Sequence, residues 1–198
     1  MLEIAIAGIH YVHYKRVFDR LDGTISSKND CWYVHTINSY NDSAVSSWCM
    51  LFGTDSEPTH YSKLLAEEKI AEKLSTLSHS PNIDRNALRT VILNSANISL
   101  EEYDAYWTRT TSYRNQSLIH REHHPNKIRN RELQYPILDP AKQTLMSLYI
   151  LLIKLARTYP NEPDQHNVYP VEFISEDSID KLESYLQSVN PNINFSEQ

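Results

Sequence analysis

Several features are scarce in this 198-residue chain, and each scarcity excludes a class of protein. There are only 3 glycines, which together with apolar residues at helical spacing favours an all-α fold. The two cysteines, Cys31 and Cys49, form neither a metal-binding spacing nor a disulfide framework, so we expect a reduced, cytoplasmic protein. The apolar run at residues 144–154 is too short to span a bilayer, and the N-terminus lacks the basic start of a signal peptide. We therefore expect no membrane association.

The spacing of apolar residues predicts helices over residues 2–21, 28–52, 62–74, 84–94, from 99 through about 120, and 140–158. We expect residues 1–158 to form one antiparallel bundle of four to five main helices. Residues 159–198 are expected to be a C-terminal extension with a short amphipathic helix.

Each long helix has a predicted buried face and predicted end signals. Gly53 is expected to end its helix as a left-handed cap, and Asp139 with Pro140 should open the last helix as N-cap and first-turn residue. The predicted buried faces are Ile4, Ala7, Tyr11, Tyr14, Phe18 and Leu21; Val34, Ile37, Ala44, Val45, Trp48, Leu51 and Phe52; Leu100, Tyr103, Tyr106, Trp107 and Thr110; and Leu145, Leu148, Tyr149, Leu152, Ile153 and Ala156.

The stretch with most chemical content is residues 111–124, at the end of the helix that starts after Ser99. Ser99 and Glu102 have the spacing of a capping box. The apolar stripe of this helix continues onto Arg114, and a guanidinium at the edge of such a stripe is costly without a partner. That partner is either a carboxylate or carbonyl of the same chain, which is a structural role, or an anion that binds and leaves.

His120 follows six residues later and has a pKa suited to proton transfer near neutral pH. Metal-free RNA cleavage needs a base for the ribose 2′-OH and a cation for the charge on phosphate, and His120 and Arg114 supply both. On an ideal helix the two side chains lie roughly 120° apart. Either the helix ends or bends near His120, or a second chain completes the site. Pro125 favours an end close behind His120.

Arg114, Asn115 and His120 together resemble the R-x(4–6)-H signature of HEPN-domain proteins. The resemblance implies a helical bundle, metal-independent endoribonuclease activity leaving 2′,3′-cyclic phosphate ends, and a homodimer whose motif helices face each other. It implies that Arg114 positions the phosphate, that Asn115 orients it and that His120 is general base or acid. A toxin or phage-defence role would also follow.

Two softer similarities extend the resemblance to a bacterial HEPN subgroup over residues 30–158. One is Trp48-x-x-x-Phe52-Gly53 with an acidic loop and His60; the other is Pro136-x-Leu-Asp139 before an apolar helix. One position departs from the family: some members carry a modifiable Tyr two residues after the motif His, where this chain has Glu122. An antitoxin partner is therefore an open possibility rather than an implied one.

The net charge of −6 argues against a general nucleic-acid binder, yet residues 109–131 hold six basic residues against Glu122 alone. A basic spot on an acidic body suits a selective phosphate site. The alternative is a loop that pairs with acidic helices of its own chain. The candidate substrate-binding residues are Tyr113, Gln116, Arg121, His123, His124 and Lys127.

Two clusters invite a metal interpretation, and we favour it for neither. His120 and His124 have helical i,i+4 spacing but lack convincingly spaced further ligands. Asp55, Glu57 and His60 have the composition of an ordinary surface loop. We expect no metal and no cofactor.

Three functions follow from these residues. The first is a homodimeric HEPN-like endoribonuclease with RNA as its partner. The second is a non-catalytic module that binds RNA or a nucleotide at the same site, or a protein through the apolar helix 140–158. The third is a structural helical protein in which Arg114 is buried with an acidic partner.

Overall fold

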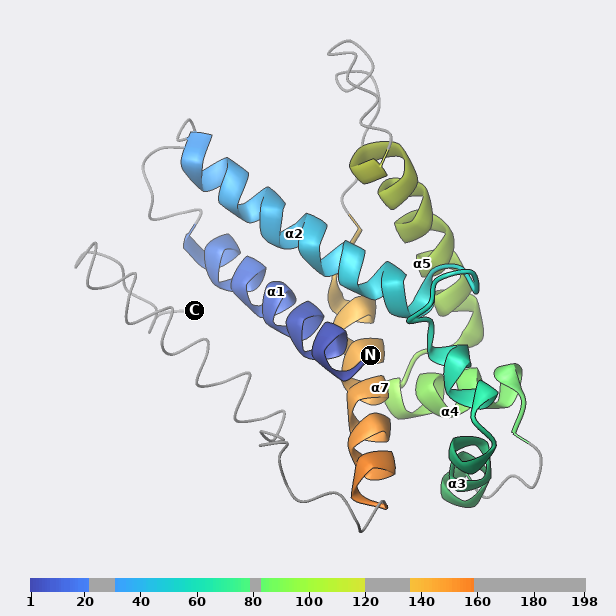
Figure 1. Ribbon diagram of the computed structural model, residues 1–198. Coiled ribbons are helices and arrows are strands. Elements are labelled where there is room, and N and C mark those ends of the chain that lie inside the picture. The colour runs from blue at the N-terminus through green and yellow to red at the C-terminus, as the bar shows by residue number, and fades with distance from the viewer. Residues whose placement is uncertain (22–30, 79–82, 120–135, 159–198) are drawn as a thin grey trace.

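The computed structural model describes residues 1–21, 31–78, 83–119 and 136–158, and within these ranges every regular element is helical (Figure 1). The expected all-α class is therefore confirmed. The elements are α1 (Leu2–Leu21), α2 (Cys31–Phe52), the 3-10 helix η1 (Tyr61–Ala66), α3 (Glu68–Ser78), α4 (Arg85–Ala96), α5 (Leu100–Tyr113), the π-helix η2 (Arg114–Ile119) and α7 (Asp139–Arg157). The predicted C-terminal extension lies outside the described residues.

Helices α1 and α2 pack side by side along their length, and α7 crosses them (Figure 1). Gly8 of α1 lies against both other helices: an added Cβ would lie 2.9 Å from Leu145 Cδ1 and 3.0 Å from Ser47 Cβ. The close approach of α2 and α7 therefore favours glycine at this position. Trp48 and Leu145 are both fully buried in the core that these helices enclose.

The buried face of α1 is rotated from the predicted one. Ala5, Ile9 and Val12 are buried, whereas Ile4, Ala7, Tyr11 and Tyr14 of the predicted face are only partly buried, and Phe18 of that face is in the core. The reason is that α1 contacts both α2 and α7, so small residues face the close contact. Tyr11, Tyr14 and Phe18 instead pack with Tyr40 of α2 in a ring cluster.

The other predicted faces are right except at helix ends. Val34 in α2, Leu100 in α5 and Ala156 in α7 are exposed, because each lies in a terminal turn where a neighbouring helix no longer covers it. Trp48 and Phe52 are core residues as predicted, with rings stacked 5.6 Å apart.

Two residues predicted to mark helix ends lie at those ends but act in a different way from the one predicted. Gly53 does follow the last residue of α2, but no described glycine has a positive φ. A Cβ at Gly53 would instead overlap the Cys49 carbonyl oxygen, so the glycine is required for space. Asp139 makes no capping bond; Leu138 is the N-cap, Pro140 lies in the first turn as expected, and the Asp139 carboxylate pairs with Arg16 of α1.

Helices α3 and α4 pack at one end of the bundle against α7 (Figure 1). The single helix predicted over residues 62–74 is two elements, η1 and α3, separated at Glu67, which has an extended backbone. Helix α4 starts at the expected place because the Asp84 side chain accepts a hydrogen bond from Ala87 N at 2.7 Å. It ends at Asn97, the single described non-glycine residue with a left-handed backbone.

Helix α7 is central in the described part of the chain, since it contacts α1, α2, α3 and α4. This position explains its wide apolar face. One polar bond crosses this core: Trp48 Nε1 donates to Thr144 Oγ1 at 2.9 Å, and both side chains are fully buried. None of the described helices is both long enough and apolar enough to cross a membrane.

Candidate functional site

The motif begins directly after α5, and the start of this helix is fixed by local hydrogen bonds. The predicted capping box is present: Glu102 N donates to Ser99 Oγ at 3.2 Å and Ser99 N donates to Glu102 Oε2 at 2.8 Å. Tyr103, Tyr106 and Thr110 of the predicted stripe are buried. Trp107 ties the middle of α5 to the end of α2, because its Nε1 donates to the carbonyls of Phe52 and Gly53 at 3.0 and 2.8 Å.

At Arg114 the α-helix gives way to the π-helix η2, which extends to Ile119. From the motif arginine onward, the backbone hydrogen bonds follow the i→i+5 pattern of a π-helix instead of the i→i+4 pattern of an α-helix. Short π-helical turns are frequent at functional sites. A bend or end of the helix near His120 was one of the two alternatives that the sequence left open, and the structure departs from regular α-helix earlier, at Arg114. His120 itself lies outside the described residues.

Arg114 has a carboxylate partner. Its Nη2 donates to Glu57 Oε1 at 2.7 Å, and the two side chains are 21% and 23% exposed. Glu57 comes from the loop between α2 and η1, 57 residues earlier in the chain. Of the two kinds of partner that the sequence left open for Arg114, the structure shows a carboxylate of the same chain. The partial exposure leaves the guanidinium within reach of solvent.

The loop that presents Glu57 is fixed by its own backbone. Glu57 N donates to the Thr54 carbonyl at 3.0 Å, and His60 N donates to the Glu57 carbonyl at 3.1 Å. Thr59 Oγ1 also donates to the Met50 carbonyl at 3.0 Å, which fastens the loop to α2. Glu57 is therefore held in place independently of Arg114.

His60 closes the same loop and serves as a structural group. It is 1% exposed, and its Nδ1 accepts a hydrogen bond from Ser62 N at 3.2 Å as the N-cap of η1. Burial lowers the pKa of His60 below its ordinary value, while the Asp55 carboxylate 3.5 Å away opposes the shift. A buried, neutral, capping imidazole is unsuited to be a base for a substrate at Arg114.

Tyr113, a predicted substrate-binding residue, is 7% exposed, and its hydroxyl donates to Asp42 Oδ1 of α2 at 2.6 Å. Because the residue next to Arg114 is anchored to α2 in this way, the position of the helix end is restricted. This geometry fits the orienting and packing role that the sequence left open for Tyr113.

Asn115 and Gln116 are exposed on η2, directly after Arg114. Both are accessible to a ligand at this surface. The remaining predicted site residues, His120, Arg121, His123, His124 and Lys127, lie outside the described residues. The structure thus places Arg114 beside Glu57 and leaves Asn115 and Gln116, the next two residues of η2, exposed.

Cys49 lies close enough to Arg114 and Glu57 for both charges to act on its thiol, but the thiol is not reactive. Burial raises the pKa of its thiol to about 12; Glu57 acts in the same direction, and Arg114 opposes it. The thiolate is the nucleophilic form, so Cys49 is a core residue rather than a nucleophile. Within the described ranges, no group of three or more His, Cys, Asp or Glu side chains is placed to hold a metal ion.

Two residues of the site were missed by the sequence analysis. Glu57 appeared there only as part of an acidic loop, and Asp42 did not appear at all. Asp42 and Tyr113 are 71 positions apart, and no helical spacing links them. The one usable signal in the sequence was the charge of Arg114 within an apolar stripe. It indicated that Arg114 needs a partner, but not which residue that partner is.

Comparison with known proteins gave no family to test the motif against: no family model, no curated protein and no solved structure matched this chain.

Proposed function

We propose that this protein is a metal-independent endoribonuclease of the HEPN type. The observation that carries the proposal is the placement of Arg114: it begins a π-helical turn on the surface of a helical bundle, and its guanidinium is partly exposed. The spacing from Arg114 through Asn115 to His120 supplies the rest of the argument.

The proposed chemistry divides between two side chains. The His120 imidazole takes the proton of a ribose 2′-OH, whose oxygen attacks the adjacent phosphorus. The bond to the 5′ oxygen of the next nucleotide breaks, and that oxygen receives a proton from an imidazolium. Arg114 stabilises the added negative charge on the phosphate, for which a planar guanidinium is well suited. The products are a 2′,3′-cyclic phosphate and a 5′-hydroxyl.

A homodimer would supply both a base and an acid, because two motifs facing each other provide two imidazoles. Asn115 and Gln116 follow Arg114 in η2 and are exposed, so they are available to a bound phosphate or to the second chain. Tyr113 and Trp107 act indirectly, since their bonds to α2 hold the end of α5 in place.

The test is RNA cleavage by purified protein in the presence of EDTA, with wild type compared with His120→Ala and Arg114→Lys. We expect the wild type to leave cyclic phosphate ends. His120→Ala should abolish cleavage. Arg114→Lys keeps the charge but loses the bidentate fork, so its rate should fall strongly.

Arg157→Ala is the matched control, because Arg157 is an exposed arginine in the last turn of α7, outside the basic residues 109–131. It should cleave nearly as fast as wild type. If folded dimers of the wild type cleave none of a broad set of RNAs, the ribonuclease proposal is wrong.

A second candidate, a non-catalytic module that binds RNA or a nucleotide, is favoured by one observation. Arg114 is bonded to Glu57, so a bound anion would exchange with a carboxylate, as in reversible binding. On this proposal His120→Ala leaves RNA affinity unchanged while Arg114→Ala lowers it. Fluorescence anisotropy with labelled RNA, together with the cleavage assay, separates the two candidates, because the non-catalytic module binds RNA without cleaving it.

A further inference from the structure

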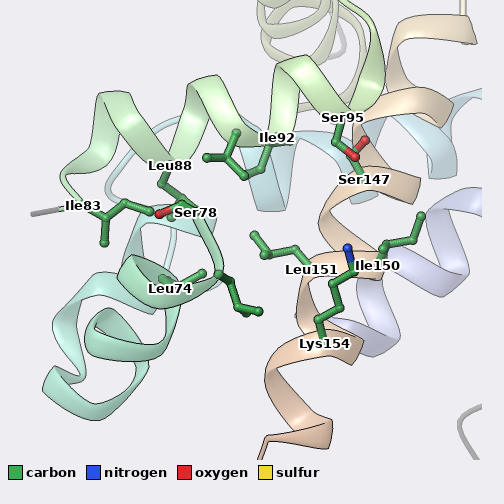
Figure 2. Close-up of a pocket in the computed structure, with 12 residues that line it drawn as sticks. Leu74, Ser78, Ile83, Leu88, Ile92, Ser95, Ser147, Ile150, Leu151 and Lys154 are labelled. Carbon is green, nitrogen blue, oxygen red and sulfur yellow. The ribbon is translucent and has the colours of Figure 1, made fainter. Parts of the chain in front are cut away.

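A pocket away from the motif lies where α3, α4 and α7 meet (Figure 2). Its volume is about 130 Å³. Leu74 of α3, Leu88 and Ile92 of α4 and Leu151 of α7 form its walls, and each of these side chains is at least nine-tenths buried. The pocket is therefore an apolar cavity lined by buried core side chains rather than a shallow depression on the surface.

The mouth of the pocket is apolar as well. Leu77 of α3 and Ile150 of α7 both line it, and they are 37% and 40% exposed. Large aliphatic side chains at an exposed rim are unfavourable unless something covers them. The opening is thus suited to an apolar molecule that enters from solvent.

Polar groups are few: Ser78 of α3 lies at one end of the pocket, and two serines lie at the opposite end (Figure 2). Ser95 of α4 and Ser147 of α7 line the pocket, and Figure 2 shows their hydroxyls turned toward the same end. Among the described residues, Lys154 is the single charged one in the lining, and none of the described lining residues carries a carboxylate. The Lys154 side chain runs back along α7 toward Ile150, so the stem lies on apolar surface and the ammonium lies at the rim (Figure 2).

We propose that this pocket binds a small carboxylate with an apolar tail of about six carbons, the tail between α3, α4 and α7 and the carboxylate at Lys154. The size follows from the volume, since a cavity of about 150 Å³ lined by aliphatic side chains holds one benzene molecule. The charge follows from Lys154, which is the one charged residue among the described residues of the lining. Ser95 and Ser147 can donate to the carboxylate oxygens.

The experiment is a titration of methyl-labelled protein with hexanoate and with 1-hexanol, followed by NMR. The two probes each have six carbons, of which five form the same alkyl tail, and they differ in the charge of the headgroup. We expect both to shift the methyl signals of Ile92 and Leu151. Hexanoate should bind at least about fivefold more tightly, the factor that corresponds to about 1 kcal/mol for a solvent-accessible ion pair.

Two variants separate the tail site from the charge site. Lys154→Met keeps the apolar stem and removes the charge, so hexanoate affinity should fall to that of 1-hexanol, which should itself be unchanged. Val91→Phe fills the cavity from α4 and should abolish binding of both probes. Ser95→Phe fills the same cavity from an exposed position and serves if Val91→Phe does not fold.

Three results would overturn the proposal. Equal affinity of the wild type for the two probes would make the pocket a general apolar cavity. Unchanged hexanoate affinity in Lys154→Met would remove the assigned cation. Shifts confined to methyls outside this pocket, or no shift up to the solubility of 1-hexanol, would remove the site.

Discussion

Replacing Glu57 by glutamine tests whether Arg114 is a phosphate contact. In the structure the guanidinium is engaged by the Glu57 carboxylate at 2.7 Å, so an incoming phosphate must displace that carboxylate. Glutamine retains an acceptor at the same place but removes the charge. The substitution therefore weakens the competitor without removing Arg114.

The magnitude follows from the exposure of the pair. Both side chains are about one-fifth exposed, at 21% and 23%, so solvent screens the ion pair and its contribution is about 1 kcal/mol. The free energy of unfolding should fall by about that amount. If displacement of Glu57 is part of binding, the affinity for RNA should rise up to about fivefold.

The assay is fluorescence anisotropy with labelled single-stranded RNA, in a His120→Ala background so that the RNA stays intact. Asp55→Asn is the matched control. It removes the same charge from the same loop and breaks a different pair, that of Asp55 with Arg85. Its effect on affinity should stay below about twofold, because both partners of that pair are about half exposed.

A double-mutant cycle gives the decisive result. In an Arg114→Ala background, Glu57→Gln should leave RNA affinity unchanged, because no guanidinium remains to be released. An equal gain in both backgrounds would refute the reasoning, since it would show a general charge effect. Weaker binding by Glu57→Gln, or a loss of stability far above 1 kcal/mol, would instead make the pair a structural element.

Three further predictions concern stability. Gly53→Ala should lower the free energy of unfolding by about 1–3 kcal/mol in urea titrations, since the new Cβ overlaps the Cys49 carbonyl; an unchanged midpoint would contradict the required close approach. The pKa of His60 is lowered in the folded protein, so the contribution of His60 to the free energy of unfolding is complete above the unfolded pKa near 6.5 and is lost as the pH falls below that value. His60→Asn keeps the capping acceptor but does not titrate. Its melting temperature should therefore fall less between pH 7 and pH 5 than that of the wild type. Thr144→Val leaves the buried Trp48 Nε1 without its acceptor and should cost about 1–3 kcal/mol, whereas a neutral result would mean that the indole finds another partner.

Local rules were enough to predict the helices but not the contacts between them. The Ser99–Glu102 capping box and the Asp84 start of α4 are confirmed because each depends on residues three positions apart. The face of α1 was wrong because its burial depends on two neighbours at once, and small residues such as Gly8 carry almost no signal in an apolar pattern. Gly53 was placed correctly for a different reason from the one expected.

The contact between Arg114 and Glu57 shows the same limit of sequence-based prediction more clearly. The sequence indicated that Arg114 needs a partner, because an unpaired guanidinium at the edge of an apolar stripe is costly. It did not indicate Glu57, since nothing in a spacing pattern brings residue 57 to residue 114. The contact requires α2 to end at Phe52 and α5 to be tied to that end by Trp107.

The exposure of the pair bears on what a carboxylate partner means for function. A fully buried arginine needs a permanent partner, and removing that partner typically costs 3–5 kcal/mol. A fully exposed arginine would need none. Arg114 lies between these limits, so Glu57 can hold the guanidinium in place at a cost to ligand binding of only about a factor of five. A same-chain carboxylate beside the motif arginine is therefore compatible with a phosphate site.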